Sequence, residues 1–209
     1  MFNEEVHHAA QNGDISTLAI IIKNRASLEV KGQYGYTPIH WAAQCGHSGA
    51  VQVLVDAKAR VNAQNFNGWT PIHRAARYDR IDVVQVLVDA KARVDMQDSE
   101  GLTPLHHAAR YDRSGVVQVL VNAKARVHMQ DSEGLTPLHH AARYGHSDIV
   151  QALVNAKARV DMQDSEGLTP LHHAARYDHR GVVRVLVASL MAGQHHEIVQ
   201  NNCHDKPIF

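Results

Sequence analysis

Cysteine is scarce in this chain, whose 209 residues include only Cys45 and Cys203. Two thiols cannot form the network of disulfide bonds that stabilises small secreted domains. The sequence also lacks any Asn-x-Ser or Asn-x-Thr site for N-glycosylation. Both absences favour a reducing compartment, and we predict an intracellular protein, either cytoplasmic or nuclear.

Long apolar runs are missing as well. Near the N-terminus the longest is Leu18–Ile22, whereas a helix that crosses a bilayer needs about 20 apolar residues. The first residues, Met1–Val6, contain two glutamates and no apolar segment, so we expect no signal peptide. The sequence therefore predicts no membrane contact.

An excess of charge of either sign is also absent. The 21 basic side chains are balanced by 21 acidic ones, which argues against a protein held to nucleic acid or anionic lipid by overall charge. With 44% hydrophobic and 20% charged residues, the composition is that of a folded globular protein. Histidine, in contrast, is abundant at 17 copies, and this excess requires an explanation.

A tetrapeptide, Thr-Pro-Ile/Leu-His, recurs at intervals of 33 residues. It begins at Thr37, Thr70, Thr103, Thr136 and Thr169. The segments 101–133 and 134–166 differ at only six of their 33 positions, so they are near copies. One period before Thr37 the tetrapeptide is lost, but His7, Ala9 and Ala10 still match His40, Ala42 and Ala43.

These matches predict a single array of six units over 1–193, because a fixed period of this length is the signature of repeat architectures. The predicted units are 1–34, 35–67, 68–100, 101–133, 134–166 and 167–193. A C-terminal tail, 194–209, follows the array. No repeat pattern extends into this tail, and we expect it to be disordered.

Each unit has the pattern of two short helices and a loop. In the fourth unit Thr103 is a helix cap and Pro104 takes the first position of a helix predicted over Pro104–Tyr111. A second helix is predicted over Val116–Ala123, where the apolar residues share one face. The segment that follows is predicted to form a projecting turn. Helices this short are marginal alone, so stacking of units must supply the core.

This pattern resembles the ankyrin repeat. The signature Gly-x-Thr-Pro-Leu-His-x-Ala-Ala is present from Gly101 to Ala109 and recurs at the period of the family. The resemblance covers about Glu4 to Ala188. It implies an all-α solenoid of L-shaped units, each with two antiparallel helices and a short β-hairpin finger. It also implies a protein that binds other proteins and is not an enzyme.

The sequence departs from the family at two turns. Lysine replaces the glycine that usually follows the second helix, at Lys58, Lys91, Lys124 and Lys157. A left-handed backbone there would cost each lysine about 1 kcal/mol. Aspartate replaces glycine after the first helix, at Asp79, Asp112 and Asp178. We therefore expect the fold to form but to be less stable than an idealised array.

Most of the histidines have a structural explanation. Six of them occupy the motif position, where the resemblance implies that the imidazole bridges successive turns: His7, His40, His73, His106, His139 and His172. The next position along holds His8, His107, His140 and His173, which we expect to be partly exposed. Stacked helices lie about 8–10 Å apart, too far for neighbouring histidines to share a zinc ion at bonds of about 2 Å.

The sequence predicts no catalytic, metal or cofactor site. A Gly-rich phosphate loop, a Gly-x-Ser-x-Gly elbow and a His-Glu-x-x-His motif are all absent. The tail segments His195-His196-Glu197 and Cys203-His204-Asp205 contain metal-binding residue types, but their spacing matches no established zinc pattern. We therefore expect neither a cofactor nor a small-molecule substrate.

The resemblance implies that partners bind at the finger tips and near the end of each first helix. The latter positions hold Arg77-Tyr78, Arg110-Tyr111, Arg143-Tyr144 and Arg176-Tyr177. We call the concave surface that these four Arg-Tyr pairs are expected to line the palm. The predicted tips are acidic, with Asp98, Glu100, Asp131, Glu133, Asp164 and Glu166. An earlier finger offers Phe66 and Trp69 instead.

We interpret the chain as a protein–protein interaction module, an adaptor or scaffold that is monomeric alone. Its partner would be a protein segment with acidic and apolar or proline-rich side chains. One alternative is a regulatory or inhibitory subunit of an enzyme or a transcription complex. Another is a polyanion or single-stranded nucleic acid bound by arginine and tyrosine, which the acidic tips oppose. Duplication could also have copied a solvated face that binds nothing.

One modification is implied by the resemblance. Intracellular asparaginyl hydroxylases act on the finger asparagine of Val-Asn-Ala segments in ankyrin proteins, and Val61-Asn62-Ala63 matches such a segment. Asn62 is therefore a candidate for hydroxylation.

Overall fold

A computed structural model of the chain describes the backbone of residues 2–204 and the side chains of residues 4–192. Within this part it contains α-helices, a single 3-10 turn η1 (Gln33–Gly35) and no β-strand. The inner helices are α1 (Phe2–Asn12), α3 (Pro38–Cys45), α5 (Pro71–Arg77), α7 (Pro104–Arg110), α9 (Pro137–Tyr144) and α11 (Pro170–Arg176). The outer helices are α2 (Ile15–Lys23), α4 (Ser48–Asp56), α6 (Ile81–Asp89), α8 (Ser114–Asn122), α10 (Ser147–Asn155) and α12 (Arg180–His204).

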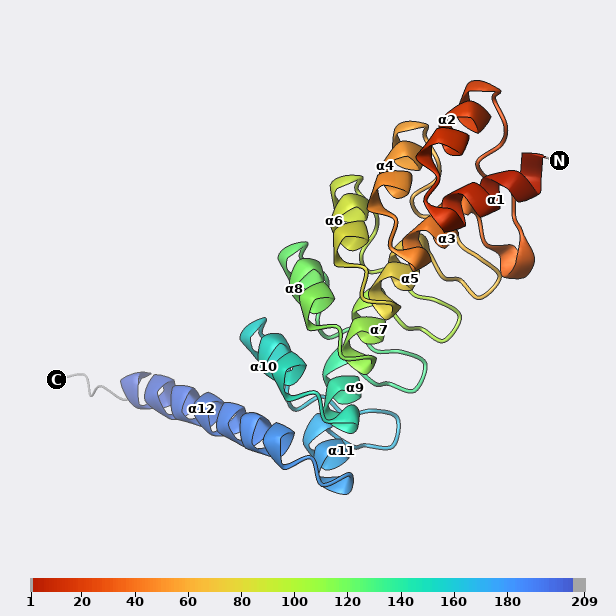
Figure 1. Cartoon of the computed structure of the whole chain (residues 1–209). Helices are drawn as coiled ribbons and strands as arrows, with labels where there is room; N and C mark the ends of the chain where they lie inside the picture. The colour runs from red at the N-terminus through yellow and green to blue at the C-terminus, as the bar shows by residue number, and fades with distance from the viewer. Residues whose placement is uncertain (1, 205–209) are drawn as a thin grey trace.

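The helices form two parallel rows. Inner helices stack on inner helices and outer helices on outer helices, from α1 and α2 to α11 and α12. Figure 1 shows these rows as a curved array, with the loops before the inner helices projecting to one side. The prediction of an all-α solenoid is therefore confirmed. None of the helices in residues 2–204 is long and apolar enough to cross a membrane.

The Thr-Pro-x-His motif starts the inner helices because its residues satisfy the free groups of the first turn. In α7, Pro104 occupies the first position, where no amide hydrogen is needed. The imidazole Nδ1 of His106 accepts a hydrogen bond from the backbone N–H of Thr103, at 3.1 Å. The threonine hydroxyl oxygen lies 2.8 Å from the same nitrogen. The histidine thus completes a capping box, a role that glutamate or glutamine usually fills.

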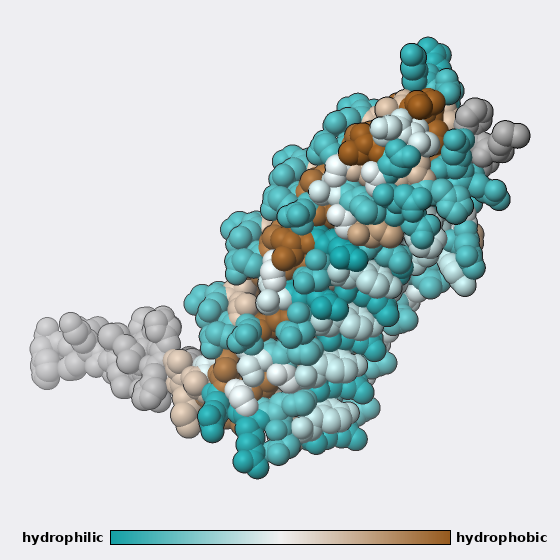
Figure 2. Space-filling view, viewed as in Figure 1, coloured by the Kyte–Doolittle hydropathy of each residue, from teal (hydrophilic) through white to brown (hydrophobic). Residues whose placement is uncertain are grey.

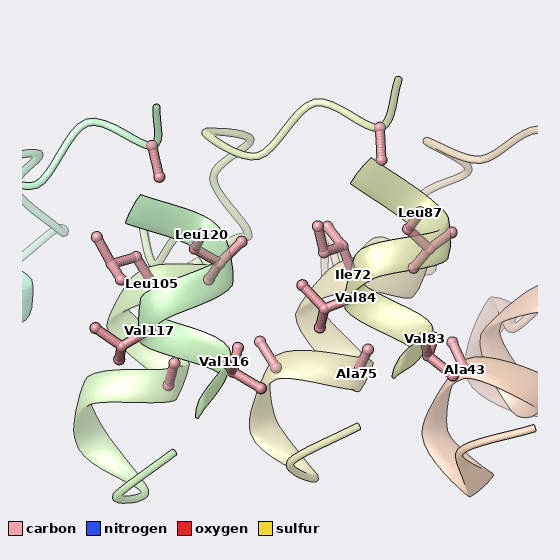
Figure 3. Close-up of a cluster of buried hydrophobic side chains, with 14 of the residues drawn as sticks. Ala43, Ile72, Ala75, Val83, Val84, Leu87, Leu105, Val116, Val117 and Leu120 are labelled. Carbon is pink, nitrogen blue, oxygen red and sulfur yellow. The ribbon is translucent and has the colours of Figure 1, made fainter. Parts of the chain in front are cut away.

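The core is a continuous strip between the two rows. Figure 3 shows Val117 and Leu120 of α8 beside Leu105 of α7, with Val116 pointing toward the inner helix of the preceding unit, and a similar arrangement one unit earlier around Ile72. Each of these side chains is almost completely buried. Ala108 and Ala109 are fully buried in the inner row. Because their side chains are small, neighbouring inner helices can approach closely. Each short helix is therefore stabilised by its neighbours rather than by its own length.

Loops join each outer helix to the next inner helix, and we call them fingers. Four of these fingers are residues 57–70, 90–103, 123–136 and 156–169. In the finger of residues 90–103 the backbone N–H of Asp98 donates to the carbonyl of Leu102, at 2.9 Å. No strand ladder forms within residues 2–204, so the fingers are closed turns rather than the expected β-hairpins. Adjacent fingers are joined by backbone hydrogen bonds, such as Ser132 N–H to the Glu100 carbonyl at 3.0 Å.

The C-terminal segment differs from the expectation of a disordered tail after residue 193. Helix α12 continues through His204, so residues 194–204 are helical. One physical reason is that no proline interrupts the segment before Pro207. The remainder of the expected tail, residues 205–209, lies outside the described residues.

Four of the outer helices, α4, α6, α8 and α10, are each followed by a lysine with a left-handed backbone. The φ angles of Lys58, Lys91, Lys124 and Lys157 are +67°, +62°, +65° and +66°. Asp79, Asp112 and Asp178 are left-handed as well, at +58°, +60° and +54°. The two predicted departures therefore fall where the chain needs a conformation that side chains with a Cβ atom disfavour.

Replacing one of these lysines with glycine should stabilise the array. Lys124→Gly removes the steric cost of the left-handed conformation, and we expect the free energy of unfolding to rise by about 1 kcal/mol. Urea unfolding followed by circular dichroism measures this change. Lys23→Gly is the matched control, because Lys23 lies within α2, where glycine should lower stability by about 1 kcal/mol. A loss of stability in both variants would contradict the prediction.

Candidate functional site

The motif histidines bridge successive units, as the resemblance implies. The Nε2–H group of His106 donates to the carbonyl of Leu135, in the next finger, at 3.1 Å. Equivalent bonds run from His40 to Trp69, from His73 to Leu102 and from His139 to Leu168. His7 reaches the carbonyl of Tyr36 at 3.1 Å. These histidines therefore connect units and are not available to a ligand.

Burial keeps the bridging imidazoles neutral. Loss of solvation lowers the pKa of His40, His73 and His139 from 6.5 to about 4. The same cause lowers the pKa of His106 to about 3. Neutrality also matches the hydrogen bonds, because Nδ1 must keep its lone pair to accept from the threonine backbone. His172, in the last unit, is exposed.

The second set of histidines is buried, and the expectation of partial exposure is wrong for three of its four members. His107, His140 and His173 are 1%, 5% and 6% exposed. Their Nε2 atoms lie 2.9, 2.8 and 2.7 Å from the Oδ2 atoms of Asp98, Asp131 and Asp164. The cause is tertiary: each finger folds its carboxylate back over the helix that follows. His8 is exposed, as expected.

These three aspartates are therefore held by hydrogen bonds within the array, although Asp131 and Asp164 also line the two hollows described below. In addition to the histidine bond, Oδ1 of Asp98 accepts the backbone N–H groups of Glu100 and Leu102, at 3.0 and 2.9 Å. Asp131 and Asp164 make the same bonds. The outward acids of the fingers are the exposed Glu100, Glu133 and Glu166.

A signal in the sequence could have revealed these pairs. Nine residues before each paired histidine there is an aspartate. Two other units have neither residue of the pair. Arg74 takes the place of the histidine in one, with Asn65 nine residues before it, and Trp41 takes it in the other, with Gly32 nine residues before it. The carboxylate and the imidazole thus occur together, which is the pattern of a buried pair.

The Arg-Tyr pairs of the palm interleave. The guanidinium carbon of Arg77 lies 4.6 Å from the ring centroid of Tyr111, and that of Arg110 lies 5.7 Å from the same centroid. Arg110 also lies 5.8 Å from the ring of Tyr144. Tyr144 in turn stacks on His146, with centroids 6.2 Å apart. Cation–π and stacking contacts thus hold Arg77, Arg110, Tyr111 and Tyr144 in a defined geometry.

The N-terminal end of the palm is built differently. Arg74, which the sequence did not single out, is buried among three aromatic rings and hydrogen-bonds the Gln44 side chain. Its guanidinium carbon lies 4.9, 5.2 and 4.9 Å from the rings of Tyr36, Trp69 and Tyr78. Phe66 stays 70% exposed at its finger tip, where Nζ of Lys31 lies 5.6 Å from its ring centroid. The structure thus brings Trp69 and Tyr78 together and leaves Phe66 apart.

Two equivalent hollows lie between the fingers and the Arg-Tyr ladder. The first, of about 320 Å³, is lined by Glu100, Glu133, Arg110, Arg143, Tyr144 and the buried His140, among others. The second, of about 350 Å³, is lined by Glu133, Glu166, Arg143, Arg176, Tyr177 and the buried His173, among others. Arg143 and Glu133 line both hollows. Figure 2 shows hydrophilic colour over the projecting fingers.

The arginines and the finger glutamates that line the hollows are not paired with one another. Within the described side chains, no ion pair shorter than 4.0 Å joins an arginine of the ladder to a finger glutamate. Asp131 and Asp164 also line the hollows, where each carboxylate is hydrogen-bonded to a histidine and to backbone N–H groups. Each hollow therefore has a basic side on the helices and an acidic side on the fingers.

Asn62 has a structural contact of its own. Its Oδ1 atom accepts the backbone N–H of Arg93, in the next unit, at 2.9 Å. Asp95 makes the equivalent bond to Arg126, and Glu29 to Arg60. The position therefore links neighbouring units, and hydroxylation of Asn62 stays a prediction.

No cluster of three or more His, Cys, Asp or Glu side chains able to hold a metal ion occurs in the part of the chain that the structure describes. The side chains of the tail segments 195–197 and 203–205 lie outside that part.

Comparison with known proteins gives one family. A family model described as ankyrin repeats (3 copies) matches residues 6–98, 58–131 and 105–198. These overlapping matches cover most of the chain. A search of curated proteins finds no match.

Proposed function

The chain belongs to the ankyrin repeat family, and from this premise we propose that it is an intracellular adaptor or scaffold that binds another protein along the palm. Ankyrin repeats generally serve as protein–protein interaction modules. The observation that carries the proposal is the ladder of arginines and tyrosines beside two equivalent hollows.

The residue types of the palm suit a binding surface. Arginine and tyrosine are enriched among residues that dominate binding energy, because they offer large area and hydrogen bonds. Here the ring contacts restrain Arg77 and Arg110 before any partner arrives, which reduces the entropy lost on binding. Unpaired guanidinium groups select a partner that carries carboxylates.

Two other functions use the same surface. A regulatory or inhibitory subunit would cover the site of an enzyme or a transcription complex with its palm. Single-stranded nucleic acid would stack on the tyrosines, but the exposed Glu100, Glu133 and Glu166 oppose a polyanion. A gel shift with single-stranded DNA at two salt concentrations distinguishes this case, because phosphate contacts would give a steep salt dependence.

Removing two arginines of the palm should abolish partner capture. We expect Arg110→Ala/Arg143→Ala to lower recovery of the partner at least about ten-fold, since each lost charged contact in an interface costs roughly 1–2 kcal/mol or more. Affinity purification followed by quantitative mass spectrometry compares this variant with the unmodified protein.

The matched control is Arg126→Ala/Arg159→Ala. This variant also removes two positive charges from positions one unit apart. Both side chains, however, are 62% exposed and line neither hollow. Proteins kept by the control and lost by the palm variant are the partners. If both variants recover the same proteins in equal amounts, the palm is not the binding surface.

A further inference from the structure

The palm repeats with a short, regular spacing. The guanidinium carbons of Arg77 and Arg110 lie 4.6 and 5.7 Å from one Tyr111 ring centroid, so they are within about 10 Å of each other. This agrees with the 8–10 Å that separates packed helices. Segments 101–133 and 134–166 are near copies, and the two hollows share Arg143 and Glu133. A bound chain therefore meets the same chemistry again about every 10 Å.

Only some backbone conformations can match this spacing with one row of side chains. A polyproline II helix has three residues per turn and rises about 3.1 Å per residue, so every third side chain returns to the same side after about 9 Å. In a β-strand, residues three apart point to opposite faces. An α-helix repeats near this distance only at every seventh residue, and with its side chains it is about 10–12 Å thick, so it places fewer of its side chains against each repeat of the palm.

The aromatic residues favour the same conformation. Tyr78, Tyr144 and Tyr177 are 37%, 42% and 46% exposed, and each presents part of a ring to the palm. Grooves lined by aromatic side chains bind proline-rich polyproline II segments, whose conformation is already restricted before binding. The tyrosines between the arginines thus give the palm the aromatic lining on which such segments lie.

The charges determine the rest of the repeat. A polyproline II segment lying in the palm would present one row of side chains to the arginines and another to Glu100, Glu133 and Glu166. The third row faces outward, and proline there maintains the polyproline II conformation. Carboxylates fit the first row, because the guanidinium groups are unpaired. Lysine or arginine fits the second row, because the finger glutamates are exposed and no ion pair of the described residues uses them.

We infer that the partner is a polyproline II segment with a period of three residues, in which each triplet carries an acidic residue, a basic residue and a proline. This inference rests on the proposed function, since it specifies what occupies the palm. Four such triplets would span the four Arg-Tyr pairs.

A synthetic peptide of four Glu-Pro-Lys triplets, labelled with a fluorophore, tests the inference on the whole 209-residue chain. Fluorescence anisotropy should show that it binds at least about ten-fold tighter than a shuffled peptide of the same composition that has no period of three. We expect Arg143→Ala to weaken binding of the triplet peptide about ten-fold, because Arg143 lines both hollows. Arg126→Ala/Arg159→Ala should leave it unchanged.

The outcomes separate the two proposals. Equal affinity for triplet and shuffled peptides, or no binding of the triplet peptide, overturns the period of three. In that case the palm remains the binding surface if Arg110→Ala/Arg143→Ala still loses its captured partner. Tighter binding of a helical peptide with charges at every seventh residue would also overturn the inference, in favour of a helix.

Discussion

Lowering the pH from 7 to 5 should destabilise the folded array by several kcal/mol. The bridging histidines have folded-state pKa values of about 4 for His40, His73 and His139, and about 3 for His106. In the unfolded chain a histidine titrates near 6.5. Between these values the unfolded chain binds protons that the folded array does not.

The sign of the effect follows from linkage. Stability rises with pH wherever the unfolded state binds more protons. The stabilising contribution of the neutral histidines is therefore complete above about pH 6.5, and it decreases as the pH falls from there toward 4. Each histidine contributes up to about 1.4 kcal/mol per pH unit in that window. Total stabilities are about 5–15 kcal/mol, so a large part of the stability is lost by pH 5.

Urea unfolding at pH 7, 6 and 5, followed by circular dichroism, measures this loss. His106→Gln removes one buried titrating group and should reduce the slope of unfolding free energy against pH by about 1.4 kcal/mol per pH unit. Val116→Ala is the control, because it removes buried apolar volume but no titrating group, so the slope should stay the same. An unfolding free energy that does not change between pH 7 and 5 would exclude this role of the histidines.

Gly134→Ala should be much more costly than Gly167→Ala. Both glycines have left-handed backbones, with φ of +78° and +77°, so alanine is strained at either position by about 1 kcal/mol. At Gly134 the new Cβ would also lie 2.8 Å from the backbone nitrogen of Ser165, in the next finger. At Gly167 it would meet no atom within 4 Å.

The contact at Gly134 must move two fingers apart. The N–H of Ser165 donates to the carbonyl of Glu133 at 3.0 Å, and a shift of either backbone weakens that bond. We expect Gly134→Ala to lower the unfolding free energy by about 2–4 kcal/mol, against about 1 kcal/mol for Gly167→Ala. Thermal and urea unfolding of the two variants give the comparison. Similar losses would mean that close packing of the fingers contributes little.

Much of this fold could be predicted from local features of the sequence. The period of 33 residues, the Thr-Pro starts and the apolar face of Val116, Val117 and Leu120 depend on interactions within a unit or on exact repetition. Helix ends were less certain: the fourth unit has Pro104–Arg110 and Ser114–Asn122 in place of Pro104–Tyr111 and Val116–Ala123. The difference arises because capping groups on either side, such as the left-handed Lys124, determine the last turn.

The candidate site was only partly predictable. The Arg-Tyr pairs were visible because they recur at one position of each unit, and the structure places Arg77 and Arg110 against Tyr111. The fate of Asp98, Asp131 and Asp164 was not visible. An aspartate at a finger tip looks exposed in sequence, and only the folded loop brings its carboxylate to the histidine of the helix that follows.

The sequence by itself thus determined the all-α repeat architecture, the Thr-Pro starts of the inner helices and the residue types of the palm, because these follow from repetition and from contacts between near neighbours in the chain. The tertiary structure alone decided which of these charges are exposed and which are buried. It turned three finger aspartates inward to buried histidines and left the finger glutamates and the arginines unpaired across the hollows. The physical reason is that burial depends on contacts between a finger and a helix, which the spacing of residues does not specify.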